Sequence, residues 1–506
     1  MNYNLNTLFI ASVMICYLPV LFLGLFDLDE GAFAATSLQM IKQNQYLVPY
    51  IGEELRLEKP IFTYWVQAIS LSIFGINEFA LRVPSIIASF LWGYYFADFV
   101  KRYIKSASRS EIFLNLLTIP GIFIISIATT ADALLNLFIT LLMINLFDYS
   151  EKKDHSLLTM SGIFVGLGFL TKGLTIIAIA GMVALLYFTY QRKLRTFFTI
   201  IFSWRAWFSF TVVVLPWLFL ISQKVGFSDL NYLFFSQTFG RFTNTFEKHD
   251  GPFFYYLFIL PIFLLPYFWD VVKGFLNLKI RNNRFESFMF IWFIFVLIFF
   301  SFSSTKLPHY IIYGFTPLAY IIYKNHLSLI NSKVNLSAVF FHSSFWLIML
   351  SVPFYLRYLS SIQTNYEVSG SVLNKFQNDE SFIIVILFLI AFFIFSYFLS
   401  FKLMLMKRIS AIALLAILST KILPLINDAT QDDIRKVAFD AREISQEVSM
   451  FKLNKPSFGF YADKISYRDL KETDIIFTRI DKLAFLDKKY EIISEHGNYL
   501  LLKIEK

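Results

Sequence analysis

The segment Ile61–Phe74, IFTYWVQAISLSIF, decides how the rest of the chain is threaded through a membrane. It is largely apolar but shorter than the roughly 20 residues that a helix needs to cross a bilayer. If it lies in the membrane interface, the basic groups of the later loops fall on one side, which is the cytoplasm by the positive-inside rule. If it crosses, the loop charges favour the opposite orientation. We predict the interfacial placement, which suits Tyr64 and Trp65 at headgroup depth.

Composition predicts a multi-pass membrane protein before any motif is considered. Of the 506 residues, 57% are hydrophobic and 16% charged, and the mean hydropathy is +0.59. The expected fold is an all-α polytopic membrane protein with about thirteen transmembrane helices. The predicted spans are Thr7–Phe26, Arg82–Val100, Ile112–Ala128, Ala133–Tyr149, Leu157–Leu170, Leu174–Tyr190, Ala206–Ile221, Phe254–Val272, Phe288–Phe302, Tyr310–Tyr323, Ala338–Leu356, Phe382–Phe401 and Ile409–Leu425.

Charge and cysteine content exclude several classes of protein. The net charge is +9, but the Lys and Arg residues stand in short groups between apolar spans. This pattern favours anionic membrane lipids over nucleic acid as the partner. The single cysteine, Cys16, excludes internal disulfides and a cysteine-ligated metal cluster. The chain has no glycine-rich phosphate loop, which argues against a cytoplasmic nucleotide sugar as substrate.

The composition changes after Leu425, where we place a domain boundary. Residues 1–426 form the predicted membrane domain, with a first outer loop at 27–81, and residues 427–506 form a small α/β soluble domain. A helix is expected over Ile434–Met450, from its apolar spacing. The expected strands are Ser457–Ala462, Asp474–Ile480, Tyr490–Ser494 and Asn498–Ile504. This domain is predicted to support the fold, with gating or acceptor recognition as the alternative.

The predicted topology gathers the unusual polar residues on the outer side of the membrane. Lys and Arg commonly extend to the interface from a helix end, but this does not explain the carboxylates Asp29, Glu58 and Asp132. Cations hold phosphate, and a neighbouring carboxylate serves as a base or metal ligand. The set therefore predicts a site for a phosphate on a lipid tail. Its members are Asp29, Glu30, Glu58, Lys59, Arg82, Asp132, Lys172, Arg241, His249, Asp250, Lys306, His309 and Tyr310.

Several of these residues lie in motifs of a known family. Asp29–Phe33 (DEGAF) resembles the Asp-Glu-x-x-aromatic motif of integral-membrane glycosyltransferases that take sugar from polyprenyl or dolichyl phosphate. Leu57–Trp65 (LEKPIFTYW) resembles the Glu-Lys-Pro segment that closes the same loop. The family comprises protein O-mannosyltransferases and the bacterial aminoarabinose transferase that modifies lipid A. Further matching segments of the bacterial branch are Phe79–Ser85, Thr171–Gly173, Lys248–Tyr256 and Lys306–Tyr310.

The resemblance implies a GT-C fold in the bacterial inner membrane. The amino terminus would be cytoplasmic, and the active site and C-terminal domain periplasmic. It also implies roles for the matching residues: Asp29 is the candidate catalytic carboxylate, with Glu30 beside it, and Lys59 contacts the donor phosphate. Glu58 and His249 form a candidate site for one divalent cation, and no other cofactor is expected. The candidate substrate-binding residues are Lys59, Arg82, Lys172, Lys306, Tyr310, Tyr64 and Asp250.

One departure and one addition refine these roles. Bacterial relatives often carry Arg-Tyr where this chain has Ala32-Phe33, so the identity of the donor sugar is open. Asp132 is a second candidate for the catalytic acid, although an acidic residue at a helix start also stabilises the helix dipole.

The expected reaction is an inverting transfer of sugar from a polyprenyl-phosphate donor to a periplasmic acceptor. The acceptor is a lipid A-type glycolipid or another envelope glycan, and a protein acceptor is the alternative within the same class. A lipid or ion transporter is the alternative from a different class. Transporters usually place ionisable residues near the bilayer midplane, within interrupted spans. Here these residues stand at the ends of spans, which favours the enzyme.

Overall fold

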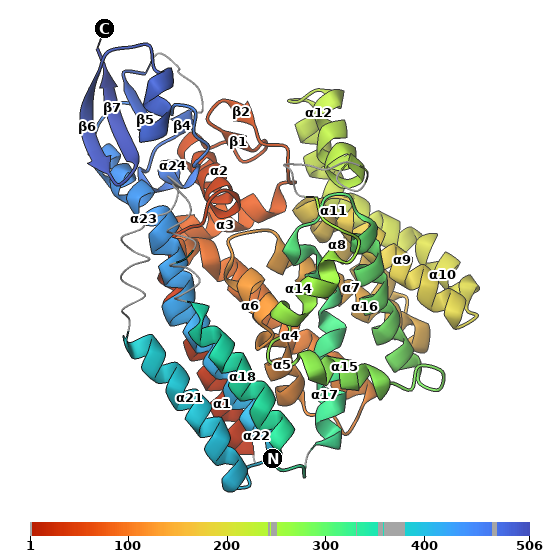
Figure 1. Ribbon diagram of the computed structural model, residues 1–506. Coiled ribbons are helices and arrows are strands. Elements are labelled where there is room, and N and C mark those ends of the chain that lie inside the picture. Colours follow the sequence, from red (N-terminus) through yellow and green to blue (C-terminus); the bar gives the residue numbers. More distant parts are fainter. Residues whose placement is uncertain are drawn as a thin grey trace. The chain divides into compact units, whose positions relative to one another are not determined.

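The computed structural model describes residues 3–240, 243, 250–329, 331–352, 358, 380–467 and 473–505 (Figure 1). These residues form many helices and a small region of sheet. They divide into two compact units, each assembled from separate stretches of chain. The first unit contains 1–14, 57–63 and 83–331, and the second contains 15–56, 64–82 and 332–506.

All regular secondary structure in the described residues of the first unit is helical. The first residues of α4 belong to the second unit. Its helices are α4 (Glu78–Tyr103), α5 (Arg109–Leu117), α6 (Pro120–Ile127), α7 (Asp132–Lys152), α8 (Ser156–Lys172), α9 (Thr175–Tyr190), α10 (Leu194–Ile201), α11 (Trp204–Ser222), α12 (Phe227–Asn231), the π-helix η2 (Tyr232–Gly240), α14 (Tyr255–Phe263), α15 (Phe268–Leu276), α16 (Arg284–Phe302), the 3-10 helix η3 (Pro308–Gly314) and α17 (Thr316–Ser328).

Helix α7 is the central helix of the first unit, and α8 and α11 pack closely beside each other. Nearly all of the α7 residues are buried, as expected for a helix that is apolar on every face. Gly162 and Gly166, four residues apart on α8, bring α11 near: a Cβ on Gly162 would lie 2.1 Å from the carbonyl oxygen of Ala206. Small residues with this spacing allow close contact between membrane helices.

The second unit combines helices with a five-stranded sheet. α1 and α3 share residues with the first unit. Its elements are α1 (Tyr3–Tyr17), η1 (Pro19–Phe22), α2 (Asp29–Gln43), the short strands β1 (Tyr50–Ile51) and β2 (Glu54–Leu55), α3 (Phe62–Phe74), α18 (Leu336–Leu350), α21 (Glu380–Phe398), α22 (Leu403–Ile417), η4 (Leu418–Ile422), α23 (Leu423–Arg442), β3 (Val448–Met450), α24 (Ser457–Tyr461), β4 (Ser466–Tyr467), β5 (Ile475–Arg479), η5 (Ile480–Phe485), β6 (Tyr490–His496) and β7 (Tyr499–Ile504).

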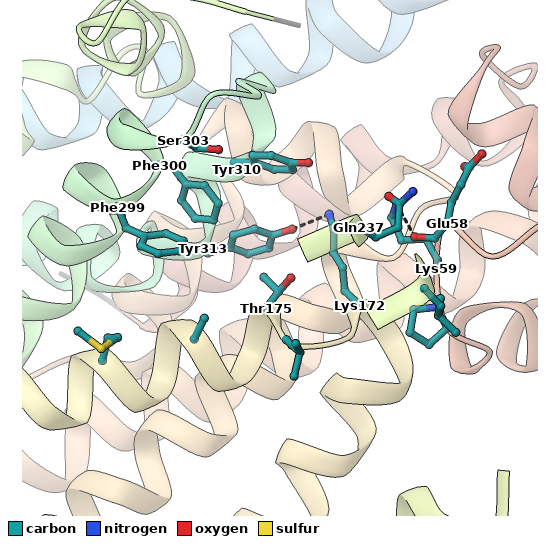
Figure 2. Close-up of a pocket in the computed structure, with 15 residues that line it drawn as sticks. Glu58, Lys59, Lys172, Thr175, Gln237, Phe299, Phe300, Ser303, Tyr310 and Tyr313 are labelled. Atoms are coloured by element: carbon teal, nitrogen blue, oxygen red, sulfur yellow. Dashed lines mark hydrogen bonds between the residues drawn. The ribbon is translucent and has the colours of Figure 1, made fainter. Parts of the chain in front are cut away.

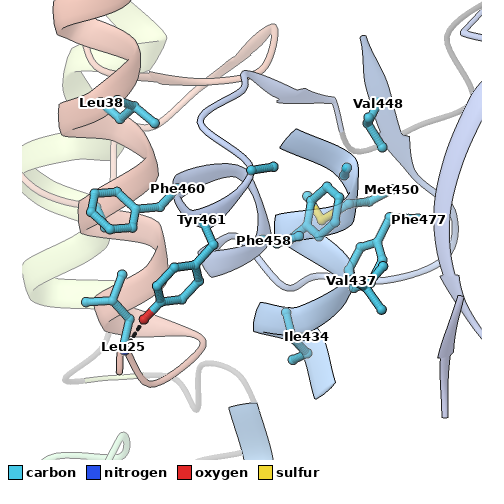
Figure 3. Packing of buried hydrophobic residues seen from close by; sticks show 14 of the residues in the cluster. Leu25, Leu38, Ile434, Val437, Val448, Met450, Phe458, Phe460, Tyr461 and Phe477 are labelled. Carbon is cyan, nitrogen blue, oxygen red and sulfur yellow. Dashed lines mark hydrogen bonds between the residues drawn. The ribbon is translucent and has the colours of Figure 1, made fainter. Parts of the chain in front are cut away.

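The sheet has the strand order β4-β3-β5-β7-β6. β3 is parallel to both β4 and β5, and β7 is antiparallel to β5 and β6. Gly497, with φ of +57°, forms the turn of the β6–β7 hairpin, a conformation that glycine adopts without strain. The sheet shares an apolar core with α2, α23 and α24, in which the rings of Phe458 and Phe477 stack at 4.0 Å (Figure 3).

The predicted membrane spans agree only in part with the helices. Six described helices are long and apolar enough to cross a membrane, or up to eight if two bent pairs each form one span. The count of thirteen stays a prediction. Ile112–Ala128 was expected as one straight span but is α5 and α6, bent by 72°, and Phe254–Val272 is α14 and α15, bent by 110°. Pro120 and Pro266 stand at these breaks, where proline cannot continue the helical hydrogen bonds.

In the C-terminal region three of the four predicted strands are confirmed and one is wrong. β5, β6 and β7 lie where strands were expected. Ser457–Ala462 was predicted as a strand, but α24 begins at Ser457, directly after Pro456, and turns three aromatic side chains into the core. The helix predicted to end at Met450 ends at Arg442, and Val448–Met450 is strand β3. α23 continues through residue 426, and the domain boundary there stays a prediction.

Candidate active site

A buried ion pair organises the polar residues of the first unit. Asp132 is the first residue of α7, and Lys172 is the last residue of α8. The Lys172 ammonium lies 2.6 Å from Asp132 Oδ1, with 11% and 8% of the two side chains exposed. The Tyr313 hydroxyl donates to the same carboxylate oxygen at 2.6 Å and lies 2.7 Å from Lys172 Nζ. These contacts hold Lys172 in one position, as expected when a charged pair is also hydrogen-bonded.

Two tyrosine rings complete the surroundings of Lys172. Its ammonium lies 5.3 Å from the ring centre of Tyr310 and 5.5 Å from that of Tyr313, which are cation–π distances. Both tyrosines belong to η3, and residues three apart on a 3-10 helix lie directly above one another. The local 3-10 geometry therefore places both rings beside one ammonium.

This group opens into a cavity of about 440 Å³ (Figure 2). Glu58 and Lys59, from the Glu-Lys-Pro segment, line the cavity together with Lys172 and Tyr310. Lys59 is half-buried, and its ammonium donates to the Glu58 carbonyl at 3.1 Å. Four predicted site residues from three distant segments thus share one cavity. Its remaining lining is Pro60, Leu174, Thr175, Ala178, Met182, Leu233, Gln237, Phe299, Phe300, Ser303 and Tyr313.

The cavity is polar at one part of its lining and apolar elsewhere. The charged side chains of the lining are Glu58, Lys59 and Lys172, whereas α9 and α16 contribute the apolar Ala178, Met182 and Phe299. The other polar side chains are Thr175, Gln237, Ser303, Tyr310 and Tyr313. A charged headgroup joined to a hydrocarbon chain requires both kinds of surface, because the cations neutralise the phosphate and the apolar wall removes the chain from water.

Two other predicted site residues of the first unit do not line this cavity. Lys306 is buried, and its ammonium donates to the carbonyl of Ser301 at 3.1 Å and to that of Ser303. It thereby caps the C-terminal end of α16, where a cation is favourable. Asp250 is exposed in the loop before α14.

The predicted divalent-cation site cannot be completed from the described residues. Glu58 lines the cavity, but His249 lies outside the residues that the structure describes. Within the described parts of the chain, no group of three or more His, Cys, Asp or Glu side chains is arranged to hold a metal.

The second unit contains the other acidic motif and a second buried ion pair. Glu30 and Arg82 lie 3.0 Å apart, with 7% and 1% of their side chains exposed. Arg82 also donates to the carbonyls of Leu23 and Gly24, at 2.8 and 2.9 Å, and Glu30 accepts from the backbone N–H of Phe26. These bonds hold the loop before α2, so they favour a structural role for Glu30 and Arg82.

Asp29 and Tyr64, also in the second unit, have contrasting surroundings. Asp29, in the first turn of α2, is exposed. Tyr64 is fully buried, and its hydroxyl accepts from Arg56 Nε at 2.8 Å. Phe33 packs on the Tyr64 ring, with 5.2 Å between ring centres. Asp29 is therefore accessible to a substrate, whereas the Tyr64 side chain is not.

Sequence reasoning missed Tyr313, Thr175 and Gln237 of the cavity. Tyr313 follows Tyr310 by three residues, a helical spacing that places both on one face. Gln237 is an isolated amide in the aromatic segment Tyr232–Gly240, and Thr175 follows Lys172 by three residues. The spacing of Tyr313 and Thr175 and the isolated amide of Gln237 indicated a site only weakly. That the three residues share a cavity is visible only in the fold.

The chain is similar to a glycosyltransferase family model and to several bacterial proteins. The family model described as dolichyl-phosphate-mannose-protein mannosyltransferase matches residues 58–219. A protein of Aquifex aeolicus is 31% identical over 310 residues, which cover 59% of this chain and 68% of the relative. An undecaprenyl phosphate-alpha-4-amino-4-deoxy-L-arabinose arabinosyl transferase of Wigglesworthia glossinidia brevipalpis is 29% identical over 333 residues, or 62% of this chain and 57% of the relative.

The fold is also similar to a solved structure. The crystal structure of ArnT from Cupriavidus metallidurans, bound to undecaprenyl phosphate, superposes with a TM-score of 0.82 at 17% identity, covering 99% of this chain and 98% of that one. The sequence match spans little more than half the length of the arabinosyl transferases of Wigglesworthia and Photorhabdus.

Proposed function

Because the chain belongs to the family of integral-membrane glycosyltransferases that use polyprenyl-phosphate-linked sugars, we propose that it transfers such a sugar to an acceptor of the bacterial cell envelope. One observation carries the proposal: Lys59 and Lys172, 113 positions apart by their numbers, line a single cavity that also has an apolar wall. This combination fits a lipid phosphate better than a free sugar or a nucleotide.

The donor phosphate binds at the cationic part of the cavity. Lys59 and Lys172 neutralise its negative charge, and the apolar side chains of α9 and α16 accommodate the first isoprene units. Lys172 is suited to this role because Asp132 and Tyr313 fix its ammonium before the ligand arrives. A preorganised charge stabilises the transition state without a reorganisation cost at the moment of reaction.

Transfer is a single displacement. An oxygen of the acceptor forms a bond to the anomeric carbon while the bond from that carbon to the phosphate oxygen breaks. The electron pair leaves with the lipid phosphate, where the two lysines stabilise it. One displacement inverts the anomeric configuration, and no covalent enzyme intermediate is required.

Asp29 is the proposed catalytic carboxylate, a role that rests on its motif and on its exposure in the first turn of α2. When the acceptor is a hydroxyl, Asp29 accepts its proton as the new bond forms. When the acceptor is a phosphate, no base is needed, and Asp29 orients the acceptor. Asp132 acts through Lys172 and is a positioning residue in this scheme, since its carboxylate already accepts two hydrogen bonds from Lys172 and Tyr313.

The names of the relatives support a first choice of donor sugar. We propose 4-amino-4-deoxy-L-arabinose on undecaprenyl phosphate as the first donor to test, because the named bacterial relatives are arabinosyl transferases with that donor in their names. The first acceptor to test is a lipid A-type glycolipid, which the motif resemblance implies. The proposed orientation has a cytoplasmic amino terminus and a periplasmic site.

The test is a transfer assay with the purified full chain in nanodiscs. A panel of labelled undecaprenyl-phosphate sugars is mixed with lipid A or with envelope protein, and both released undecaprenyl phosphate and labelled acceptor are measured. Lys59→Ala is expected to lower transfer about 10²-fold or more. The matched control is Lys224→Ala, because Lys224 is exposed in the same unit.

The assay also distinguishes the alternatives. Label on protein instead of glycolipid identifies a protein glycosyltransferase. Undiminished release of lipid phosphate by Asp29→Asn contradicts the role given to Asp29. Movement of an intact labelled lipid across the bilayer, without cleavage of the glycosidic bond, identifies a transporter.

A further inference from the structure

The loop that leads into α2 is bound by side chains from the C-terminal part of the second unit. The backbone N–H of Leu25 donates to the Tyr461 hydroxyl at 2.8 Å (Figure 3). The Asp27 carboxylate accepts two bonds from Ser457, one from the backbone N–H at 3.0 Å and one from the hydroxyl at 2.5 Å. Both oxygens of Asp27 are therefore held by one residue that is 430 positions away in sequence.

Two glycines permit this close approach. A Cβ on Gly31 would lie 2.0 Å from Asp27 Oδ1 and 2.6 Å from the backbone nitrogen of Ser457. A Cβ on Gly24 would lie 2.3 Å from Asn427 Oδ1, and the Asn427 amide donates to the Gly24 carbonyl at 2.9 Å. Any larger residue at position 31 must displace either Asp27 or the start of α24.

Apolar packing supports the same contact. Ala34 and Leu38 of α2 share a buried core with Phe458, Phe460 and Tyr461 of α24. The start of α2 is thus held at two points. Before the helix, Asp27 is hydrogen-bonded to Ser457, and within the helix, Ala34 and Leu38 are packed in this core. Asp29 lies between the two fixed points, two residues after Asp27 and five before Ala34, and its own side chain is exposed.

We propose that Asp27 and Ser457 form a latch through which the C-terminal part of the second unit positions Asp29 for sugar transfer. The latch rests on the proposed function, because it matters only if Asp29 acts in the reaction. Asp27 and Ser457 are positioning residues, since they reach the reaction only through Asp29. Displacement of a catalytic group by about 1 Å can lower a rate about 10²-fold, so a latch of this kind has a measurable effect.

The test measures kcat and donor KM for Ser457→Ala, Gly31→Ala and Asp27→Asn in the transfer assay. Ser457→Ala removes one latch bond, and Gly31→Ala separates the two residues; each is expected to lower kcat about tenfold or more while donor KM stays within about twofold. Asp27→Asn keeps an oxygen that accepts from the Ser457 backbone and an amide that donates to the hydroxyl, so it is expected to retain most of the activity.

Two controls separate positioning from a general loss of stability. Gly181→Ala, in helix α9, adds the same methyl group where a Cβ meets nothing within 4 Å, and is expected to leave kcat unchanged. Each kcat is measured on the monodisperse fraction from size-exclusion chromatography, so that unfolded protein does not contribute. Ser457→Ala is then combined with Asp29→Asn. In this double variant the latch has no effect to exert, because the carboxylate that it positions is absent.

The double variant decides the proposal. If the latch acts through Asp29, Ser457→Ala has no further effect on kcat in the Asp29→Asn background. Full additivity of the two losses overturns the latch, and so does full activity of Ser457→Ala beside an inactive Asp29→Asn. Full activity of Asp29→Asn is a different result, because it overturns the proposed role of Asp29 and the latch together.

Discussion

Two buried carboxylate–cation pairs, one in each unit, look alike in composition and differ in surroundings. Glu30 and Arg82 are 3.0 Å apart, and Arg82 is further bound to the carbonyls of Leu23 and Gly24. Asp132 and Lys172 are 2.6 Å apart, but Lys172 lines a cavity. Both members of the first pair hold the loop before α2, whereas the cation of the second pair lines a cavity. A buried charge is thus evidence of a site only when part of it faces free space.

The largest expected effect comes from breaking the first pair. Glu30→Ala leaves the Arg82 guanidinium buried without its carboxylate, which typically costs about 3–5 kcal/mol of stability. We expect the apparent Tm of the purified chain to fall by about 3–5 °C, because each kcal/mol lowers the Tm of a 506-residue chain by about 1 °C. The matched control is Glu380→Ala, because Glu380 is exposed in the same unit.

The double variant Glu30→Ala with Arg82→Met sharpens this result. Replacing both partners by apolar side chains removes the uncompensated charge, so much of the lost stability is expected to return. If the double variant is no more stable than Glu30→Ala, the buried Arg82 charge is not the cause of the lost stability. The contrast between the Glu30–Arg82 pair and the Asp132–Lys172 pair is then wrong.

Neutralising the second pair is expected to affect activity more than stability. Lys172→Met combined with Asp132→Asn removes both charges of the pair, so the apparent Tm should change by only about 1 °C. Loss of the fixed cation should lower transfer about 10²- to 10³-fold. Lys224→Met serves as the control for removal of a lysine. A large fall in Tm with transfer retained in the folded fraction would reverse the assignment of this pair.

The smallest expected effect is that of the hydroxyl that joins the second pair. Tyr313→Phe keeps the ring beside Lys172 but removes the bonds to Asp132 and Lys172. One such bond contributes about 0.5–1.5 kcal/mol, so transfer should fall about twofold to tenfold. Tyr190→Phe, which removes an exposed hydroxyl bonded to a carbonyl, is the control. An unchanged rate for Tyr313→Phe shows that Asp132 alone positions Lys172.

The sequence by itself determined the membrane class, most of the helices and the motifs of the family. Apolar periodicity and composition are local properties, and DEGAF and LEKPIFTYW identify their family wherever they lie in space. The same local information found Glu58, Lys59, Lys172 and Tyr310, which do share a cavity. It could not separate the roles of Glu30 and Asp132, because both read as acidic residues near a helix start.

Only the tertiary structure decided what each charge faces. Tyr313 was missed because its partner Asp132 lies 181 positions earlier, and no local pattern links residues that far apart. Ser457–Ala462 was predicted as a strand because a short run rich in Phe and Tyr is typical of strands. It is the helix α24 because its conformation depends on burying three aromatic rings against α2 and the sheet. Burial and pairing are set by long-range packing, so the division between charges that hold a loop and charges that line a cavity appears only after the chain has folded.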